Sequence, residues 1–242
     1  MAQDVWFRDL GEMRYKDAWD FQEQVLQENA AVKSRLRELS DEGCPPEVSL
    51  QTRHHLYFVA HPHVYTLGKS GDIQHALLSE ENMARRGIDF FRTNRGGDIT
   101  YHGPGQLVGY PVFDLEKFYT DIGKYLRNIE EVVILTLADY GLKGERSLGE
   151  TGVWLEPDKK GRERKICAIG VRTSRWITMH GFALNVNTDL NYFNFIIPCG
   201  IQGKQVTSLQ KELGRTLDMD DVKLRVKANF ERVFDIKLLD EQ

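Results

Sequence analysis

The stretch "TGVWLEPDKKGRERKICAIGVRTSRWITMHGFALNVN", residues 151 to 187, decides the fold. It contains three runs rich in β-branched and apolar residues, "GVWLE", "KICAIGVRT" and "WITMHGFALNVN". A charged turn, "PDKKGRER", separates the first two runs, and a tight turn separates the last two. Runs bounded by turns in this way predict a β-meander of three strands.

Two further strand regions precede the meander. Residues 54 to 72, "HHLYFVAHPHVYTLGKSGD", read as two strands joined by a proline turn. Residues 87 to 115, "GIDFFRTNRGGDITYHGPGQLVGYPVFDL", read as a strand, a glycine-rich loop and a second strand that begins at "QLVGYP". The strands therefore cluster in the middle of the chain.

Helical periodicity appears on both sides of these strands. Apolar residues recur at helical spacing from Lys16 to Leu39, where Asn29 is a candidate break, and again from Phe118 to Gly141. A third helix is expected over residues 218 to 234, with Asp220 or Asp221 near its cap. Strands clustered between helices, without strict βαβ alternation, predict an α+β fold with a mixed, mainly antiparallel sheet flanked by helices.

The composition is that of an ordinary globular enzyme. The 242 residues are 41% hydrophobic and 28% charged, and the formal net charge of -4 gives no overall basic field for nucleic acid. No apolar run approaches the ~18 residues of a membrane span, and the N-terminal residues lack a signal-peptide core. We therefore expect a single catalytic domain over residues 1 to 242, a cytoplasmic location, and neither nucleic acid nor membrane as a partner.

The three cysteines are dispersed and odd in number, which favours reduced thiols over a disulfide framework. Cys44 lies in a glycine- and proline-rich loop and reads as incidental. Cys167 has small and apolar neighbours on an expected strand, as a buried core thiol would. Cys199 lies between Pro198 and Gly200 at an expected turn, where both a structural role and a nucleophilic role stay open.

Residues 92 to 111, "RTNRGGDITYHGPGQLVGYP", form a loop dense in glycine, which is typical of a ligand cradle but also of paired tight turns. The loop lacks the Gly-Lys-Ser/Thr ending of a P-loop and the spacing of a dinucleotide fingerprint. His102 within it is a candidate for either a structural or a catalytic role. The histidines show no metal-ligand spacing, and "HPH" at 61 to 63 has no carboxylate or cysteine beside it, so no metal site is predicted.

A nucleophilic cysteine needs a cation nearby, because at a free pKa of roughly 8.5 only a few per cent of the thiol ionises near neutral pH. Lys165 opens the strand "KICAIG" directly after the basic turn. Its alternative role is that of the last member of a solvated charge run.

Three blocks resemble the lipoate-pathway octanoyltransferases. They are "RGGDITYHGPGQLVGYPVFDL", the meander extended to Leu190, and "FNFIIPCGIQGKQVTSL", and they occur in the family's order. The resemblance is clearest over residues 55 to 210, whereas residues 29 to 54 diverge or are inserted. It implies the fold of biotin and lipoate protein ligases.

The resemblance also implies roles for particular residues. Cys199 matches the nucleophile that carries the acyl group as a thioester, and Lys165 matches its lysine partner. The matches to the substrate-binding stretches are Arg95, Gly96, Gly97, Asp98, Ile99, Thr100, Tyr101 and His102, then Ala168, Ile169 and Gly170, and then Gly181, Phe182 and Ala183.

The implied reaction moves an octanoyl group from acyl carrier protein to a lysine of lipoyl domains or of the glycine cleavage H protein, without a cofactor. It would be the first step of endogenous lipoate biosynthesis. The basic turn at residues 159 to 165 would steer acidic partners. An ATP-dependent lipoate or biotin ligase of the same fold is the main rival, and a non-catalytic relative that binds carrier domains is another.

Overall fold

The computed structural model describes residues 2–43, 45, 50–197 and 205–241 of the chain. Cys44 and Cys199 lie outside the described residues. The larger sheet has eight strands within this part of the chain. Seven of them lie side by side in the order β10 (Gln205–Val206), β8 (Arg164–Ser174), β9 (Ile177–Asn185), β6 (Gln106–Val112), β2 (His54–Ala60), β1 (Gln3–Glu12) and β11 (Ile236–Asp240), and β7 (Val153–Leu155) pairs with β8.

The expected meander is present as β7, β8 and β9, which pair antiparallel. The antiparallel pairing continues through β6 to β2, whereas β1 runs parallel to both β2 and β11, and β10 runs parallel to β8. The prediction of a mixed sheet is therefore confirmed. Strands β1 and β11 were not predicted, because their sequences carry charged residues that interrupt the apolar pattern.

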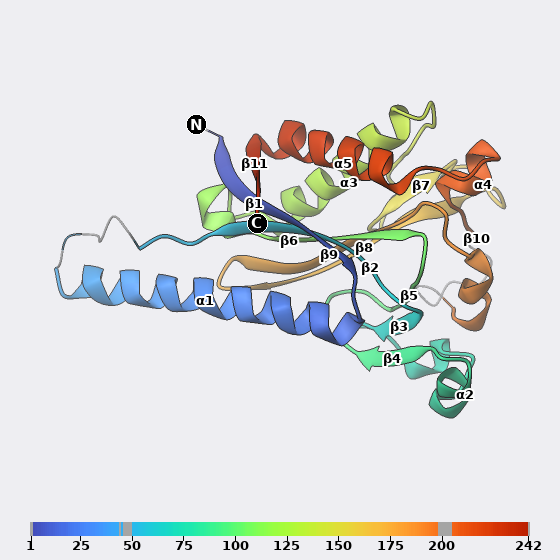
Figure 1. Cartoon of the computed structure of the whole chain (residues 1–242), viewed down its shortest axis with the longest axis horizontal. Coiled ribbons are helices and arrows are strands. Elements are labelled where there is room, and N and C mark those ends of the chain that lie inside the picture. Colours follow the sequence, from blue (N-terminus) through green and yellow to red (C-terminus); the bar gives the residue numbers. More distant parts are fainter. Residues whose placement is uncertain (1, 44, 46–49, 198–204, 242) are drawn as a thin grey trace.

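Helices cover both faces of this sheet (Figure 1). α1 (Tyr15–Asp41) packs on one face, where Ala18, Val25 and Leu26 join the inward side chains of β6 and β9. α3 (Ile122–Ala138) and α5 (Met219–Phe234) pack on the other face. Successive residues of one strand point to opposite faces, so each central strand supplies both apolar layers.

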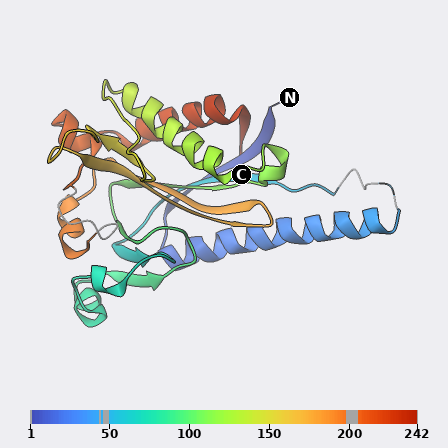
Figure 2. The same cartoon turned by 180° about the vertical axis from the view of Figure 1, so that it is seen from behind.

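A smaller sheet lies beside the N-terminal end of α1, as Figure 2 also shows from behind. Its strands are β4 (Asp89–Arg92), β3 (Val64–Leu67) and β5 (Ile99–His102), in that order. The glycine-rich loop of the sequence thus contains a strand, β5, that its glycine density concealed. Short helices complete the described chain: η1 (Ile73–His75), α2 (Glu80–Arg85), η2 (Leu115–Lys117), η3 (Leu190–Phe195) and α4 (Leu209–Leu213).

The predicted helices are confirmed with three corrections. α1 has no break at Asn29, because the Asn29 amide pairs with the backbone N–H and C=O of Arg53, both at 2.8 Å, and leaves the helical ladder intact. α3 begins at Ile122, after Phe118, since Asp121 caps it. The cap of α5 is Asp218, and Asp220 lies in the first turn.

Within the described part of the chain, no helix combines the length and the apolar character that crossing a bilayer requires.

Candidate active site

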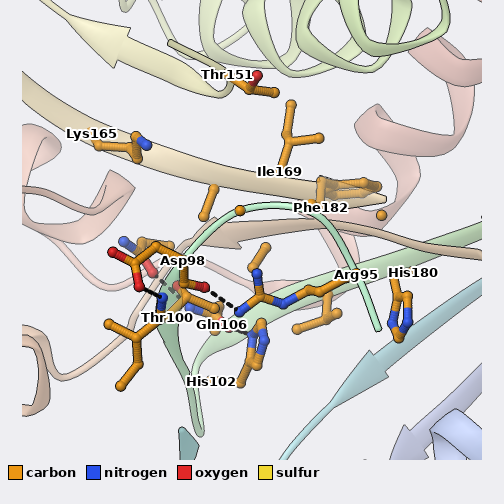
Figure 3. A pocket seen from close by; sticks show the side chains of 18 of the residues that line it. Arg95, Asp98, Thr100, His102, Gln106, Thr151, Lys165, Ile169, His180 and Phe182 are labelled. Atoms are coloured by element: carbon orange, nitrogen blue, oxygen red, sulfur yellow. Dashed lines mark hydrogen bonds between the residues drawn. The ribbon is translucent and has the colours of Figure 1, made fainter. Parts of the chain in front are cut away.

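A cavity of about 360 Å³ opens where the meander meets the smaller sheet (Figure 3). Strands β6, β8 and β9 form one wall, and the loop before β5 forms another. The first turn of α1 and the turn at residues 149 to 151 complete it. Side chains from sequence-distant elements therefore surround one space, which has the size of a small-molecule pocket.

Most of the predicted substrate-binding residues line this cavity. Those that do are Arg95, Gly97, Asp98, Ile99, Thr100, His102, Ala168, Ile169, Gly170, Gly181, Phe182 and Ala183, together with Lys165. Gly96 and Tyr101 do not. The Gly96 N–H bonds the Val171 carbonyl at 2.9 Å and ties the loop to β8, while the Tyr101 ring is fully buried against Tyr192 and Phe193.

Arg95 stabilises the loop before β5 through hydrogen bonds of its buried side chain. Only 7% of the residue is exposed, and its guanidinium donates to the Thr66 carbonyl at 2.6 Å and to the Asp98 carbonyl at 2.9 Å. The backbone of this loop also approaches Gly68 closely, since a Cβ on Gly68 would lie 2.2 Å from the Gly97 carbonyl oxygen. Arg95 thus holds the cavity wall in shape through backbone contacts.

Asp98 connects the cavity to the chain that leads toward Cys199. One Asp98 carboxylate oxygen lies 2.6 Å from Nδ1 of His75, and the other accepts the Ile99 N–H at 2.7 Å. The backbone carbonyl of His75 in turn accepts the Ile197 N–H at 2.8 Å. The described chain before residues 198 to 204 therefore ends beside the residue that pairs with Asp98.

Lys165 lies in the cavity wall and not in a solvated charge run. Its side chain is 13% exposed, and its ammonium lies 4.6 Å from the centre of the Trp154 ring and 3.9 Å from a Glu150 carboxylate oxygen. Val206, which follows the segment 198 to 204, pairs with Lys165 in β10 and also lines the cavity. Lys165 is therefore a partly buried lysine at the edge of the cavity, close to the chain that follows Cys199.

The buried carboxylate of Glu130 stabilises the turn at residues 149 to 152, which contains Glu150. Glu130 is fully buried, accepts the Gly152 N–H at 3.1 Å, and pairs with Arg127 at 2.6 Å and Arg146 at 3.1 Å. The backbone of Gly152 has a φ of 121°, which favours glycine. These contacts hold the wall opposite the arginine loop.

His102 has the surroundings of a structural histidine. It is 6% exposed, its Nδ1 bonds the Gln106 side-chain oxygen at 2.8 Å, and its ring stacks on Tyr15. Burial lowers the pKa of His102 well below its usual value, so the ring is neutral. Of the two roles left open, the structure favours hydrogen bonding over proton transfer.

Cys167 is a core thiol, as predicted. It is fully buried, and burial raises the pKa of its thiol far above the ordinary range, so it stays a neutral thiol.

Sequence reasoning missed several cavity residues because no local motif marks them. The cavity residues that were not singled out are Tyr15, Val108, Tyr110, Gly149, Glu150, Thr151, His180, Asn185, Phe193 and Val206. Only tertiary packing brings the start of α1 to β9. The strand pattern of β9 shows which residues alternate, but not that His180 faces a cavity.

No group of histidine, cysteine or acidic residues suited to a metal ion occurs in the described ranges.

The fold and the cavity define a family. The model of the lipoyl protein ligase A/B catalytic domain matches residues 14–231, and the chain belongs to this family. A lipoate protein ligase from Thermoplasma acidophilum superposes with a TM-score of 0.67 at 17% identity, covering 100% of this chain and 87% of that one. A lipoate-protein ligase A bound with ATP gives the same TM-score and identity, with coverage of 100% and 89%. These neighbours confirm the expected fold.

Curated relatives are more similar in sequence. An octanoyltransferase of Christiangramia forsetii is 53% identical over 98% of this chain and 99% of its own length. An octanoyltransferase of Flavobacterium johnsoniae is 53% identical over 99% of this chain and 100% of its own. The predicted resemblance to octanoyltransferases is confirmed, and these matches extend over nearly the whole chain.

Proposed function

We propose that the protein transfers an octanoyl group from octanoyl acyl carrier protein to a lysine of lipoyl domains or of the glycine cleavage H protein, through a thioester on Cys199. The observation that carries the proposal is the position of Lys165, a partly buried lysine in the cavity wall that pairs with the strand following Cys199. The similarity to octanoyltransferases over nearly the whole chain supports it.

In the first half-reaction, the Cys199 thiolate attacks the thioester carbonyl of the donor. The bond from that carbonyl to the phosphopantetheine sulfur breaks, a bond to the Cys199 sulfur forms, and the leaving thiolate takes up a proton. The Lys165 ammonium stabilises the attacking thiolate and supplies a proton to the leaving sulfur.

In the second half-reaction, the amine of the acceptor lysine attacks the Cys199 thioester. An amide bond forms, Cys199 leaves as a thiolate, and Lys165 takes the proton that the amine loses. Exchange of one thioester for another is nearly isoenergetic, and conversion of a thioester to an amide is strongly downhill, so the reaction needs no ATP and no cofactor.

The acyl chain would occupy the cavity beyond Lys165. Ala168 and Ala183 are neighbours in register across β8 and β9, and Val108 lies beside Ala183 on β6. These small and apolar side chains line the cavity. An apolar chain buried there gains about 0.8 kcal/mol for each methylene removed from water.

The basic turn contributes less to partner steering than its sequence suggests. Glu156 pairs with Lys159, Arg162 and Arg164, and Arg164 also bonds Glu212 at 2.6 Å. Much of the local positive charge is therefore balanced within the protein. We place the reaction in the cytosol, where the dispersed thiols stay reduced.

The test is intact mass spectrometry after incubation with octanoyl carrier protein. The unmodified chain should gain the mass of one octanoyl group, and a pulse with a lipoyl domain should remove it. Cys199→Ser should show no thioester adduct, and Cys167→Ser, which changes only the core thiol, should still label. Full, hydroxylamine-sensitive labelling of Cys199→Ser would refute the assignment, and labelling that requires ATP and free octanoate would favour the ligase.

A further inference from the structure

Three polar side chains that line the cavity are buried and bonded to one another. His102, Gln106 and Asn185 are each no more than 6% exposed. Nδ1 of His102 lies 2.8 Å from the Gln106 side-chain oxygen, and the two side chains lie close together in Figure 3. The Gln106 amide donates to the Asn185 side-chain oxygen at 2.9 Å, and the Asn185 amide donates to the backbone carbonyl of Thr207 at 3.0 Å. These four residues therefore form one continuous hydrogen-bond network.

Backbone carbonyls fix the direction of every bond in this network. A carbonyl oxygen only accepts, so the Gln106 atom that bonds the Tyr101 carbonyl at 3.1 Å is the amide nitrogen, and the Gln106 oxygen faces His102. The same reasoning holds for Asn185, whose amide nitrogen is identified by the Thr207 carbonyl. Nδ1 of His102 therefore carries the proton, and each member of the network donates to the next.

The second ring nitrogen of His102 faces a donor that belongs to the protein. Nε2 lies 3.4 Å from the Thr66 hydroxyl oxygen, which itself accepts from the Arg95 guanidinium at 2.9 Å. The Thr66 hydrogen is thus available to Nε2. Burial lowers the pKa of His102 well below its usual value, so this nitrogen stays unprotonated. Both ring nitrogens contact protein groups, which suits a residue that holds other residues in place.

The network ends on the chain that follows Cys199. Thr207 is fully buried, and three of its groups are bonded. Its carbonyl accepts from Asn185, its N–H donates to the Lys165 carbonyl at 2.9 Å, and its hydroxyl donates to Glu212 at 2.6 Å. The bond from Asn185 thus fixes the backbone at the point where this chain lies beside Lys165.

This bond matters because the strand that it supports is very short. β10 has two residues, fewer than most strands, and it pairs only with the start of β8 in the described part of the chain. Few ladder bonds therefore hold it in place. Catalysis is sensitive to such a contact, since misplacing a reacting group by about 1 Å costs on the order of 10²-fold in rate.

We infer that His102 is a positioning residue, which acts through Gln106 and Asn185 to hold the chain following Cys199 against Lys165. The inference rests on the proposed function for its effect on catalysis, and not for the network itself. A general base would exchange a proton with the reacting groups, whereas His102 in this role only donates one hydrogen bond. Any side chain that donates from the place of Nδ1 should therefore replace it.

Hydrogen exchange at the Thr207 amide tests the network without any catalytic step. His102→Leu and Asn185→Leu should each speed this exchange about 3- to 10-fold, the effect of losing one hydrogen bond. His102→Asn should stay within about twofold of the unmodified protein, because the Asn amide nitrogen stands where Nδ1 stands. Asn187→Leu is the control, since Asn187 bonds the backbone of Leu217 instead, at 2.8 and 3.0 Å. Unchanged exchange in both network variants would overturn the inference.

Transfer kinetics then separate positioning from proton transfer. The kcat of octanoyl transfer should fall about 10²-fold in His102→Leu and in Asn185→Leu, and His102→Asn should stay within about threefold of the unmodified protein. The double variant should lose little more than either single variant, because both act on the same bond to Thr207. Gln106→Met breaks the network at its middle and replaces any variant that does not fold, as judged by thermal unfolding.

Two results would contradict this part of the inference. An equal loss in His102→Asn and His102→Leu would assign proton transfer to His102, and full activity in Asn185→Leu would show that the network does not position the site. Failure of the proposed function looks different, because the unmodified protein then forms no octanoyl adduct on Cys199. In that case the exchange at Thr207 still decides whether His102 holds this chain.

Discussion

Lys165→Met should lower the rate of octanoyl transfer by about 10²- to 10⁴-fold, the range over which a positioned proton-transfer group contributes. Methionine keeps most of the length and the apolar contact of the lysine stem against Trp154, but it removes the ammonium. Because thiolate stabilisation and proton transfer both depend on that group, the loss should appear in kcat. Steady-state transfer from octanoyl carrier protein to a lipoyl domain measures it, and thermal unfolding verifies the fold.

A second measurement separates the two roles of Lys165. Alkylation of Cys199 by iodoacetamide at neutral pH reports thiolate alone, and it should slow about tenfold in Lys165→Met if the lysine favours the thiolate. Lys159→Met is the matched control, since that lysine pairs with Glu156 on the exposed turn, with 61% of its side chain accessible. It should change neither quantity by more than about twofold. A Lys165→Met variant with the transfer rate of the unmodified protein would reject the pair.

The sequence predicts best the parts of this site that depend on local pattern. The meander and the amphipathic α3 follow from alternation and helical periodicity, and the positions of Lys165 and Cys167 on one strand follow with them. β5 was missed because Gly96, Gly97 and Gly103 flank it and suggest a continuous loop. A high glycine content shows only which backbone conformations are allowed. β5 forms because it pairs with β3, which is a tertiary contact that the local sequence does not show.

The remainder of the cavity depends on long-range contacts that no local pattern encodes. Tyr15 precedes the helix expected from Lys16, and its place beside His102 depends on how α1 crosses the sheet. Arg95 reads as a substrate ligand from its sequence, and the pattern does not show that its guanidinium also donates to the Thr66 and Asp98 carbonyls. In both cases the residue type is informative, but one partner, His102 for Tyr15 and Thr66 for Arg95, lies tens of residues away in the chain.

Lys33→Met should reduce the free energy of unfolding by about 3–5 kcal/mol, the usual cost of breaking one partner of a buried ion pair. Lys33 lies in α1, within the stretch 29 to 54 to which the sequence pattern assigns no role, and is 6% exposed. Its ammonium lies 2.8 Å from Asp114 and 2.8 Å from Glu116, and it donates to the Arg175 carbonyl at 2.7 Å. Lys33 thus links the C-terminal half of α1 to the turn between β8 and β9. Its loss leaves the 1%-exposed carboxylate of Asp114 without its cation. Urea unfolding followed by circular dichroism measures the change.

The same helix supplies the control. Lys16 also pairs with an aspartate, Asp20, but their side chains are 54% and 61% exposed, so Lys16→Met should cost no more than about 0.5 kcal/mol. Combining Lys33→Met with Asp114→Asn should recover part of the loss, because the amide keeps the Thr52 contact at 2.9 Å and removes the stranded charge. Equal, small losses in Lys33→Met and Lys16→Met would show that the Lys33 ion pairs do not anchor α1 to the sheet. A large loss confined to Lys33→Met would show that this buried ion pair anchors the C-terminal half of α1 to the sheet.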